Sequence, residues 1–201
     1  MVNSRQLSQH RSVMTTRAEP LLTIDDLDAM PENDGYRYEI IEGELFVSRS
    51  PGLTHQIVAT NLAVLIGTYL KTNAIGIVVA TPGLVLSNYS GVIPDLVFFL
   101  HEQRAKIVTD ERLTAPPDLV IEIVSPGSKN IRRDRVSKLN LYSTHGVPEY
   151  WIVDPQRLQL ERYVMRGASL DLLETLHLGD HLTTDAIPGF SCEVRDIFIE
   201  T

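Results

Sequence analysis

The chain has 201 residues, of which 43% are hydrophobic and 22% are charged, so it can form one compact domain with a good apolar core. Its formal net charge of −8 argues against a protein that binds nucleic acid by bulk positive charge alone, although it leaves room for a local basic patch. The single Cys192 cannot form an internal disulfide, which favours a reducing compartment, and no apolar run approaches the roughly 18 residues of a membrane span.

The N-terminal segment is polar, carries three arginines and lacks the apolar stretch of a secretory signal. We therefore expect residues 1–18 to form a disordered tail and residues 19–201 to form a single domain. A bacterial cytoplasm is the expected location, and no membrane partner is expected.

The first half of the domain shows clear periodic patterns. A short helix is expected after Thr23, which can cap it, and a β-hairpin over 36–48 is expected to turn at "EGE". Apolar residues at helical spacing predict a long helix that begins with Thr54 as its N-cap and ends near residue 72. Three apolar strand-like runs follow, at 75–87, 91–100 and 116–125.

The second half begins with another helix, expected at about 134–145, where Gly146 can cap its C-terminus and Pro148 can stop it. A strand at 149–154 and a hairpin formed by 158–165 and 169–178 come next, and 187–200 closes the domain. The fold class is therefore α/β (α+β). Its α-βββ-α-β core is a mixed sheet flanked by helices, with added hairpins at both ends.

Two central strands carry an acid within an apolar run: Asp95 in "VIPDLVFFL" and Glu122 in "DLVIEIVS". A charge taken out of water is costly unless it is paired or bound to a metal. Side chains alternate across a strand, so the two carboxylates can meet on one face if the strands are neighbours. Such an oxygen pair suits Mg²⁺ or Mn²⁺. The competing interpretation places each acid at a solvated strand end or in an ion pair.

The segment "KNIRRDRVSK" reverses the charge of the chain locally. Its cations are Lys129, Arg132, Arg133, Arg135 and Lys138, against the single acid Asp134. Cations near a helix N-terminus favour phosphate binding, although a solvated helix start explains the arginines equally well. Lys138 falls within the inward arc of the helix, from where it can point at the two carboxylates or snorkel into solvent.

The pattern "YEIIEGEL…SPG…H…PDLVFF…PPDLVIEIVSPGS…D…K…Y…GVPEYWIVDP" resembles the Uma-two family of predicted restriction endonucleases, a branch of the PD-(D/E)XK nuclease superfamily, over about 23–199. Asp95 and Glu122 match the superfamily signature, but Val124 stands where its lysine is expected. In this family the lysine lies on the following helix, and Lys138 matches it.

The resemblance implies a restriction-endonuclease-like fold and a set of site residues. Asp95, Glu122 and the backbone carbonyl of Ile123 would bind the divalent metal, while Lys138 would act on the attacking water or stabilise the transition state. Glu39 and His55 would line the cleft, and Glu39 would be a further ligand or hold a metal-bound water. The competing interpretations are that Glu39 is a surface acid of the hairpin and that His55 is a polar residue in the first helical turn.

The function implied is an endonuclease that uses Mg²⁺ or Mn²⁺ to hydrolyse DNA phosphodiester bonds. Flanking phosphates would meet the basic segment, in particular Arg132, Arg133 and Arg135, and a homodimer is expected by analogy with nucleases that cut two strands. Two alternatives stay open. One is a catalytically drifted nucleic-acid-binding or oligomeric module, which Val124 and the acidic net charge favour. The other is a hydrolase of a smaller phosphoester.

Overall fold

The computed structural model describes residues 20–31 and 34–199, so the tail predicted at 1–18 lies outside the described residues. The elements in chain order are α1 (Ile24–Asp28), β1 (Tyr36–Ile41), β2 (Glu44–Arg49), α2 (Leu53–Thr72), β3 (Gly76–Ala80), β4 (Leu84–Ser87), β5 (Ser90–Val92), β6 (Leu96–Leu100), the 3₁₀ turn η1 (His101–Gln103), α3 (Arg104–Ile107), β7 (Val108–Thr109), β8 (Arg112–Leu113), β9 (Leu119–Ile123), α4 (Ser128–Arg132), the π-helical segment η2 (Arg133–Lys138), α5 (Leu139–Thr144), β10 (Glu149–Asp154), β11 (Gln159–Arg166), β12 (Ser169–His177), β13 (His181–Thr183), β14 (Ser191–Glu193) and α6 (Arg195–Phe198).

The main sheet is mixed and has the strand order β12-β11-β10-β9-β6-β3. Its β9–β10 pair is parallel, because the helical segment α4-η2-α5 connects the two strands, and its other pairs are antiparallel. A second sheet has the order β2-β1-β5-β4-β8-β7, and β13 pairs with β14. The expected mixed sheet flanked by helices is confirmed.

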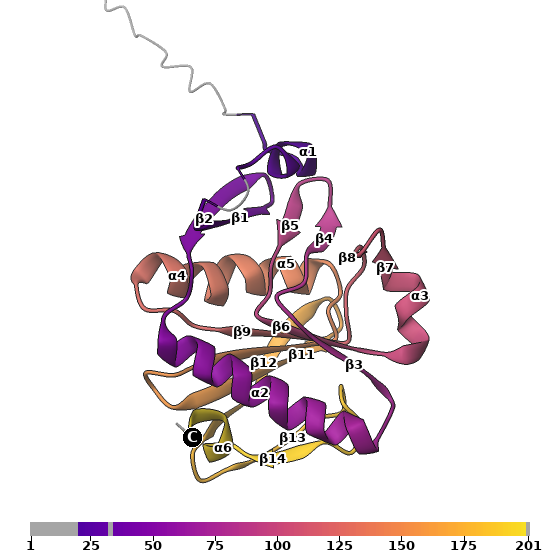
Figure 1. Ribbon diagram of the computed structural model, residues 1–201, viewed down its shortest axis with the longest axis vertical. Helices are drawn as coiled ribbons and strands as arrows, with labels where there is room; N and C mark the ends of the chain where they lie inside the picture. Colours follow the sequence, from indigo (N-terminus) through magenta and orange to yellow (C-terminus); the bar gives the residue numbers. More distant parts are fainter. Residues whose placement is uncertain (1–19, 32–33, 200–201) are drawn as a thin grey trace, which may run out of the picture.

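Helices cover both faces of the main sheet, with β6 and β9 lying between α2 and the α4–α5 segment in Figure 1. Side-chain alternation on β9 sends Leu119 and Ile121 into the core beneath α2, and Val120 into the core beneath α5. Burial on both faces explains why these strands read as nearly continuous apolar runs. Glu122 lies two residues after Val120, so its side chain points to the same face of the sheet, toward α5.

The α2 helix is, by length and composition, long and apolar enough to cross a membrane. This is weak evidence, because core helices of soluble proteins have the same properties. Here Val58, Leu62 and Ile66 of α2 are buried within the core against the main sheet.

Two of the predicted apolar runs are each divided between the two sheets. The run at 75–87 forms β3 of the main sheet and β4 of the second sheet, with Pro82 between them. The run at 91–100 forms β5 and β6 in the same way, with Pro94 between them. Proline has no backbone N–H for a sheet ladder, so each strand breaks there and the chain crosses between the sheets. Asp95 therefore lies at the junction of the two sheets.

The Thr23 cap predicted for the first helix is confirmed, because α1 begins at Ile24 with Thr23 as its N-cap. The other two predicted helix starts differ from the structure. The α2 helix begins at Leu53 with Gly52 as its N-cap, in place of Thr54. The second helical segment begins at Ser128 and not near 134, because its polar first turns cover the polar site rather than apolar core, which hides their helical periodicity. Gly146, just after this segment, has a φ of +75°, the left-handed conformation expected of a C-terminal cap.

Candidate active site

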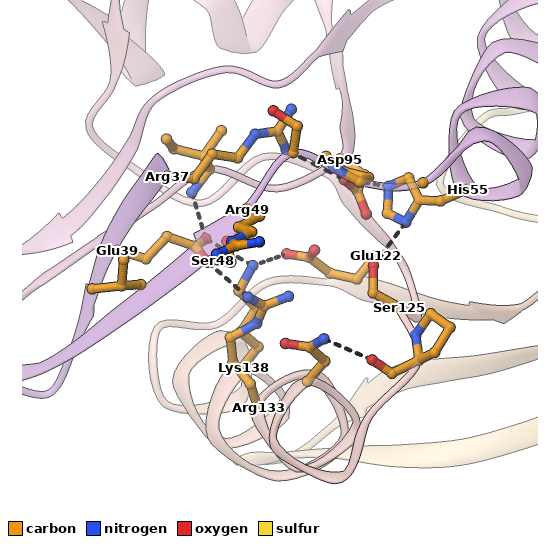
Figure 2. A pocket seen from close by; sticks show the side chains of 17 residues that line it. Arg37, Glu39, Ser48, Arg49, His55, Asp95, Glu122, Ser125, Arg133 and Lys138 are labelled. Atoms are coloured by element: carbon orange, nitrogen blue, oxygen red, sulfur yellow. Dashed lines mark hydrogen bonds and ion pairs between the residues drawn. The ribbon is translucent and has the colours of Figure 1, made fainter. Parts of the chain in front are cut away.

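A cavity of about 350 Å³ lies where the two sheets meet the helical segment. The β1–β2 hairpin forms one wall, α4 and η2 form the opposite wall, and the ends of β6 and β9 with the first turn of α2 form the floor (Figure 2). The structure brings all five residues expected to be catalytic to this cavity: Asp95, Glu122, Lys138, Glu39 and His55.

Asp95 reaches this cavity because β6 and β9 are antiparallel neighbours, with Val97 paired to Val120. One of its oxygens accepts a hydrogen bond from the backbone N–H of Ile123 at 2.8 Å, and the other lies 3.0 Å from Nε2 of His55. Burial by itself would raise the pKa of Asp95, but the hydrogen bond and charge of His55, with the Ile123 N–H, hold it below its usual value. Asp95 is therefore a carboxylate at neutral pH.

Lys138 links the carboxylates of two different elements. Its Nζ lies 2.7 Å from Oε1 of Glu122 on β9 and 2.8 Å from Oε1 of Glu39 on β1, as Figure 2 shows. The hydroxyl of Tyr142 donates to the same Glu122 oxygen at 2.8 Å, and the backbone N–H of Ile93 donates to Glu39 at 2.8 Å. A π-helical turn ends at Lys138, and such turns are frequent at functional sites.

The charges around Glu122 do not balance. Four buried carboxylates, those of Glu122, Asp95, Asp134 and Glu39, are close to three cations: the buried ammonium of Lys138, the largely buried guanidinium of Arg133 and the partly exposed guanidinium of Arg37. The pKa of Glu122 is raised to about 8: burial is the largest cause, Lys138 opposes it, and the carboxylates of Asp95, Asp134 and Glu39 add to it. Burial lowers the pKa of Lys138, but Glu122 and Glu39 outweigh it and raise this pKa above its usual value. Lys138 is thus an ammonium ion suited to stabilising negative charge.

His55 connects Asp95 to a residue that the sequence analysis missed. Its Nδ1 lies 3.3 Å from the hydroxyl of Ser125, directly after β9, while its Nε2 contacts Asp95. The two contacts hold the imidazole ring in one orientation. Tyr142 and Arg37 were also missed. Tyr142 lies four residues after Lys138 on the same helical face, and Arg37 lies two residues before Glu39 on the same strand face, so spacing alone could have suggested both.

The basic segment is arranged differently from the expected phosphate-binding face. Arg133 contacts Asp134 at 2.8 Å and Glu39 at 3.6 Å. Arg135 pairs with Asp154 and Glu161 on β10 and β11. Arg132 is exposed, and the side chain of Lys129 lies outside the described part of the chain. Two of the four cations expected to bind DNA are therefore engaged with carboxylates of the protein itself.

The donor set of the cavity fits a hard divalent cation. Among the described residues no cluster of three or more His, Cys, Asp or Glu side chains is arranged for a metal. Mg²⁺, however, needs one or two carboxylates and keeps several waters, and Asp95 and Glu122 supply oxygen donors in a cavity with excess negative charge. Ile123 contacts Asp95 through its N–H, which leaves its carbonyl as the atom expected to face a metal.

Comparisons with known proteins identify the family and support the fold. A family named Uma2, described as "Putative restriction endonuclease", matches residues 24–195. The chain is also similar to a crystal structure from Anabaena variabilis described as "a putative nuclease belonging to DUF820". That match has a TM-score of 0.67 and 17% sequence identity, and covers 88% of this chain and 97% of the other. The search of curated proteins gave no match.

Proposed function

Because the chain belongs to the Uma2 family of putative restriction endonucleases, we propose that it is an endonuclease that hydrolyses DNA phosphodiester bonds with the help of a divalent metal ion. One observation carries the proposal. The Lys138 ammonium lies between Glu122 and Glu39 in a cavity that also contains Asp95, although these residues come from four different elements. Such a convergence of buried charges is costly for folding and is typical of active sites.

Asp95 and Glu122 would hold the metal, which is Mg²⁺ or Mn²⁺ in this proposal. When bound, the ion would supply a Lewis acid for the phosphate and a more acidic water. His55 holds Asp95 in place through the contact at 3.0 Å, while Ser125 contacts the other ring nitrogen. These two residues position the carboxylate.

Lys138 has a separate role from the carboxylates. As an ammonium ion it would stabilise the negative charge that develops on the scissile phosphate. Glu39 and Glu122 orient it from two sides, and Tyr142 fixes Glu122. The superfamily signature places its lysine in the strand, where this chain has Val124. In this proposal Lys138 of the following helix takes over the role of that lysine.

The convergence favours catalysis over a drifted binding module, since a module without chemistry has no need for buried carboxylates that lack balancing charge. Homodimerisation and a cytoplasmic location form part of the proposal on sequence grounds.

The test combines metal titration with a nuclease assay. Mg²⁺ and Mn²⁺ are titrated calorimetrically into wild type, Asp95→Asn/Glu122→Gln and the control Asp171→Asn, which changes an exposed acid on β12. The same proteins are incubated with supercoiled plasmid and single-stranded circular DNA. We expect metal binding and strand cleavage in wild type and control, and neither in the double variant. Cleavage by the double variant at the wild-type rate, or no cleavage by any protein, would overturn the proposal.

A further inference from the structure

The reactive groups of the proposed site are buried rather than displayed on a surface. Asp95 is 7% exposed, Glu122 2% and Lys138 1%. The phosphates of a duplex lie on the outside of a wide and stiff cylinder, which cannot bend into a narrow cavity to reach groups on its floor. A single strand is flexible, and proteins that bind one do so in a groove lined by cations.

The cavity continues into two further hollows, one at each side. A hollow of about 570 Å³ lies between β2 and the α4–η2 wall and shares Val47, Asn130 and Arg133 with the site. A smaller one of about 200 Å³ runs along the first turn of α2 and shares Gly52, His55 and Pro126 with it. The three hollows are neighbours that share lining residues, and the two larger ones lie between the hairpin on one side and the helical segment on the other.

The site cavity itself is small. Its volume of about 350 Å³ is near the lower end of the range for pockets that enclose small ligands, roughly 300–1,000 Å³. Such a space suits one nucleotide unit of a chain at a time.

The β1–β2 hairpin carries two arginines that line the cavity, whereas Arg133 and Arg135 of the helical segment are paired with carboxylates of the protein itself. Arg37 and Arg49 both line the cavity, with Ser48 between them in space and directly opposite Arg37 on β2. The ion-pair partner of Arg37 is Asp95, at a distance of 3.9 Å. Among the described residues Arg49 has no ion pair, and its guanidinium lies 5.9 Å from the ring centre of the exposed Tyr36. Both arginines can thus bind phosphates without breaking a close ion pair.

We propose that the substrate is a single strand of DNA, threaded between the β1–β2 hairpin and the α4–η2 segment with its phosphates bound by Arg37 and Arg49. This inference rests on the proposed nuclease function and adds the form of the substrate and the residues that bind it.

The first test compares substrates. A labelled oligothymidine strand, alone or annealed to oligoadenosine, is incubated with wild-type protein and Mn²⁺. We expect the single strand to be cut on the order of 100-fold faster, since a duplex must first be unpaired. Equal rates on strand and duplex would overturn the inference while leaving the nuclease function standing. No cleavage of either would overturn the nuclease function, and the inference with it.

The second test measures binding without cleavage. Fluorescence anisotropy with EDTA present gives the affinity for the single strand as a function of salt for wild type, Arg37→Gln/Arg49→Gln and Arg166→Gln. Arg166 is an exposed arginine at the end of β11 and serves as the matched control. We expect the double variant to lower the salt slope by about 1.4, which is about 0.7 for each lost phosphate contact, and the control to leave it unchanged. An unchanged slope in the double variant would overturn the assignment of these arginines.

Discussion

The charge imbalance around Glu122 makes the stability of the protein depend on pH in a specific direction. Burial among other carboxylates raises the pKa of Glu122 from 4.5 to about 8. The folded state therefore binds a proton at this group more tightly than the unfolded chain does. The contribution is fully present below about pH 4.5 and is lost as the pH rises through about 8, so stability should fall across this window. Glu122→Gln removes the titrating group and with it this part of the pH dependence.

The size of the effect follows from the pKa. One pKa unit corresponds to about 1.4 kcal/mol, so a rise from 4.5 to about 8 corresponds to about 5 kcal/mol if the site does not rearrange. Domains of this size have unfolding free energies of about 5–15 kcal/mol, so the effect is large enough to measure. The glutamine can still contact Lys138 and Tyr142, which limits the structural cost of the change.

The assay is urea unfolding at a series of pH values from about 5 to about 9, with EDTA present, for wild type and Glu122→Gln. We expect the difference in unfolding free energy between the two proteins to shift by several kcal/mol in favour of the variant between the two ends of the series. The control, Glu102→Gln, changes an exposed acid of η1 and should follow the wild-type curve. Parallel curves for wild type and Glu122→Gln would refute the charge imbalance. Adding Mg²⁺ should flatten the wild-type curve, because a bound cation replaces the missing positive charge.

Three further predictions follow from the contacts of the site. Lys138→Met should destabilise the fold by about 3–5 kcal/mol in urea unfolding, because it leaves buried carboxylates without their cation, and should abolish cleavage; wild-type activity in this variant would contradict the role of Lys138. His55→Gln should weaken metal binding by about 10–100-fold in calorimetry, because Asp95 loses the group that orients it, and an unchanged affinity would refute that positioning. Arg135→Gln should leave the affinity for DNA unchanged in anisotropy and lower the unfolding free energy, because this arginine is engaged with Asp154 and Glu161.

Much of the fold was predictable because its patterns are local. Alternation and helical spacing within short windows indicated the hairpin, α2, the central strands, and the helix and strand that follow them. The family resemblance seen in the motifs is confirmed by the match over 24–195. The start of α1 after Thr23 was predicted correctly, whereas the start of the α4–η2–α5 segment was wrong for a physical reason. The first turns of the α4–η2 segment face charged groups of the cavity, so their sequence is polar where a core-facing helix would be apolar.

The acids Asp95 and Glu122 can be found in the sequence alone, because an ionisable residue in an apolar run is visible without knowing what lies beside it. The sequence also indicates that Lys138 lies on the inward face of its helix. The partners of these charges, in contrast, follow from how the elements pack together. Glu39, Glu122 and Lys138 are far apart in the chain, and Arg135 reaches acids on β10 and β11. Whether a cation binds DNA or the protein's own carboxylates depends on which elements the fold brings within ion-pair distance, and that information is not local to any segment of the sequence.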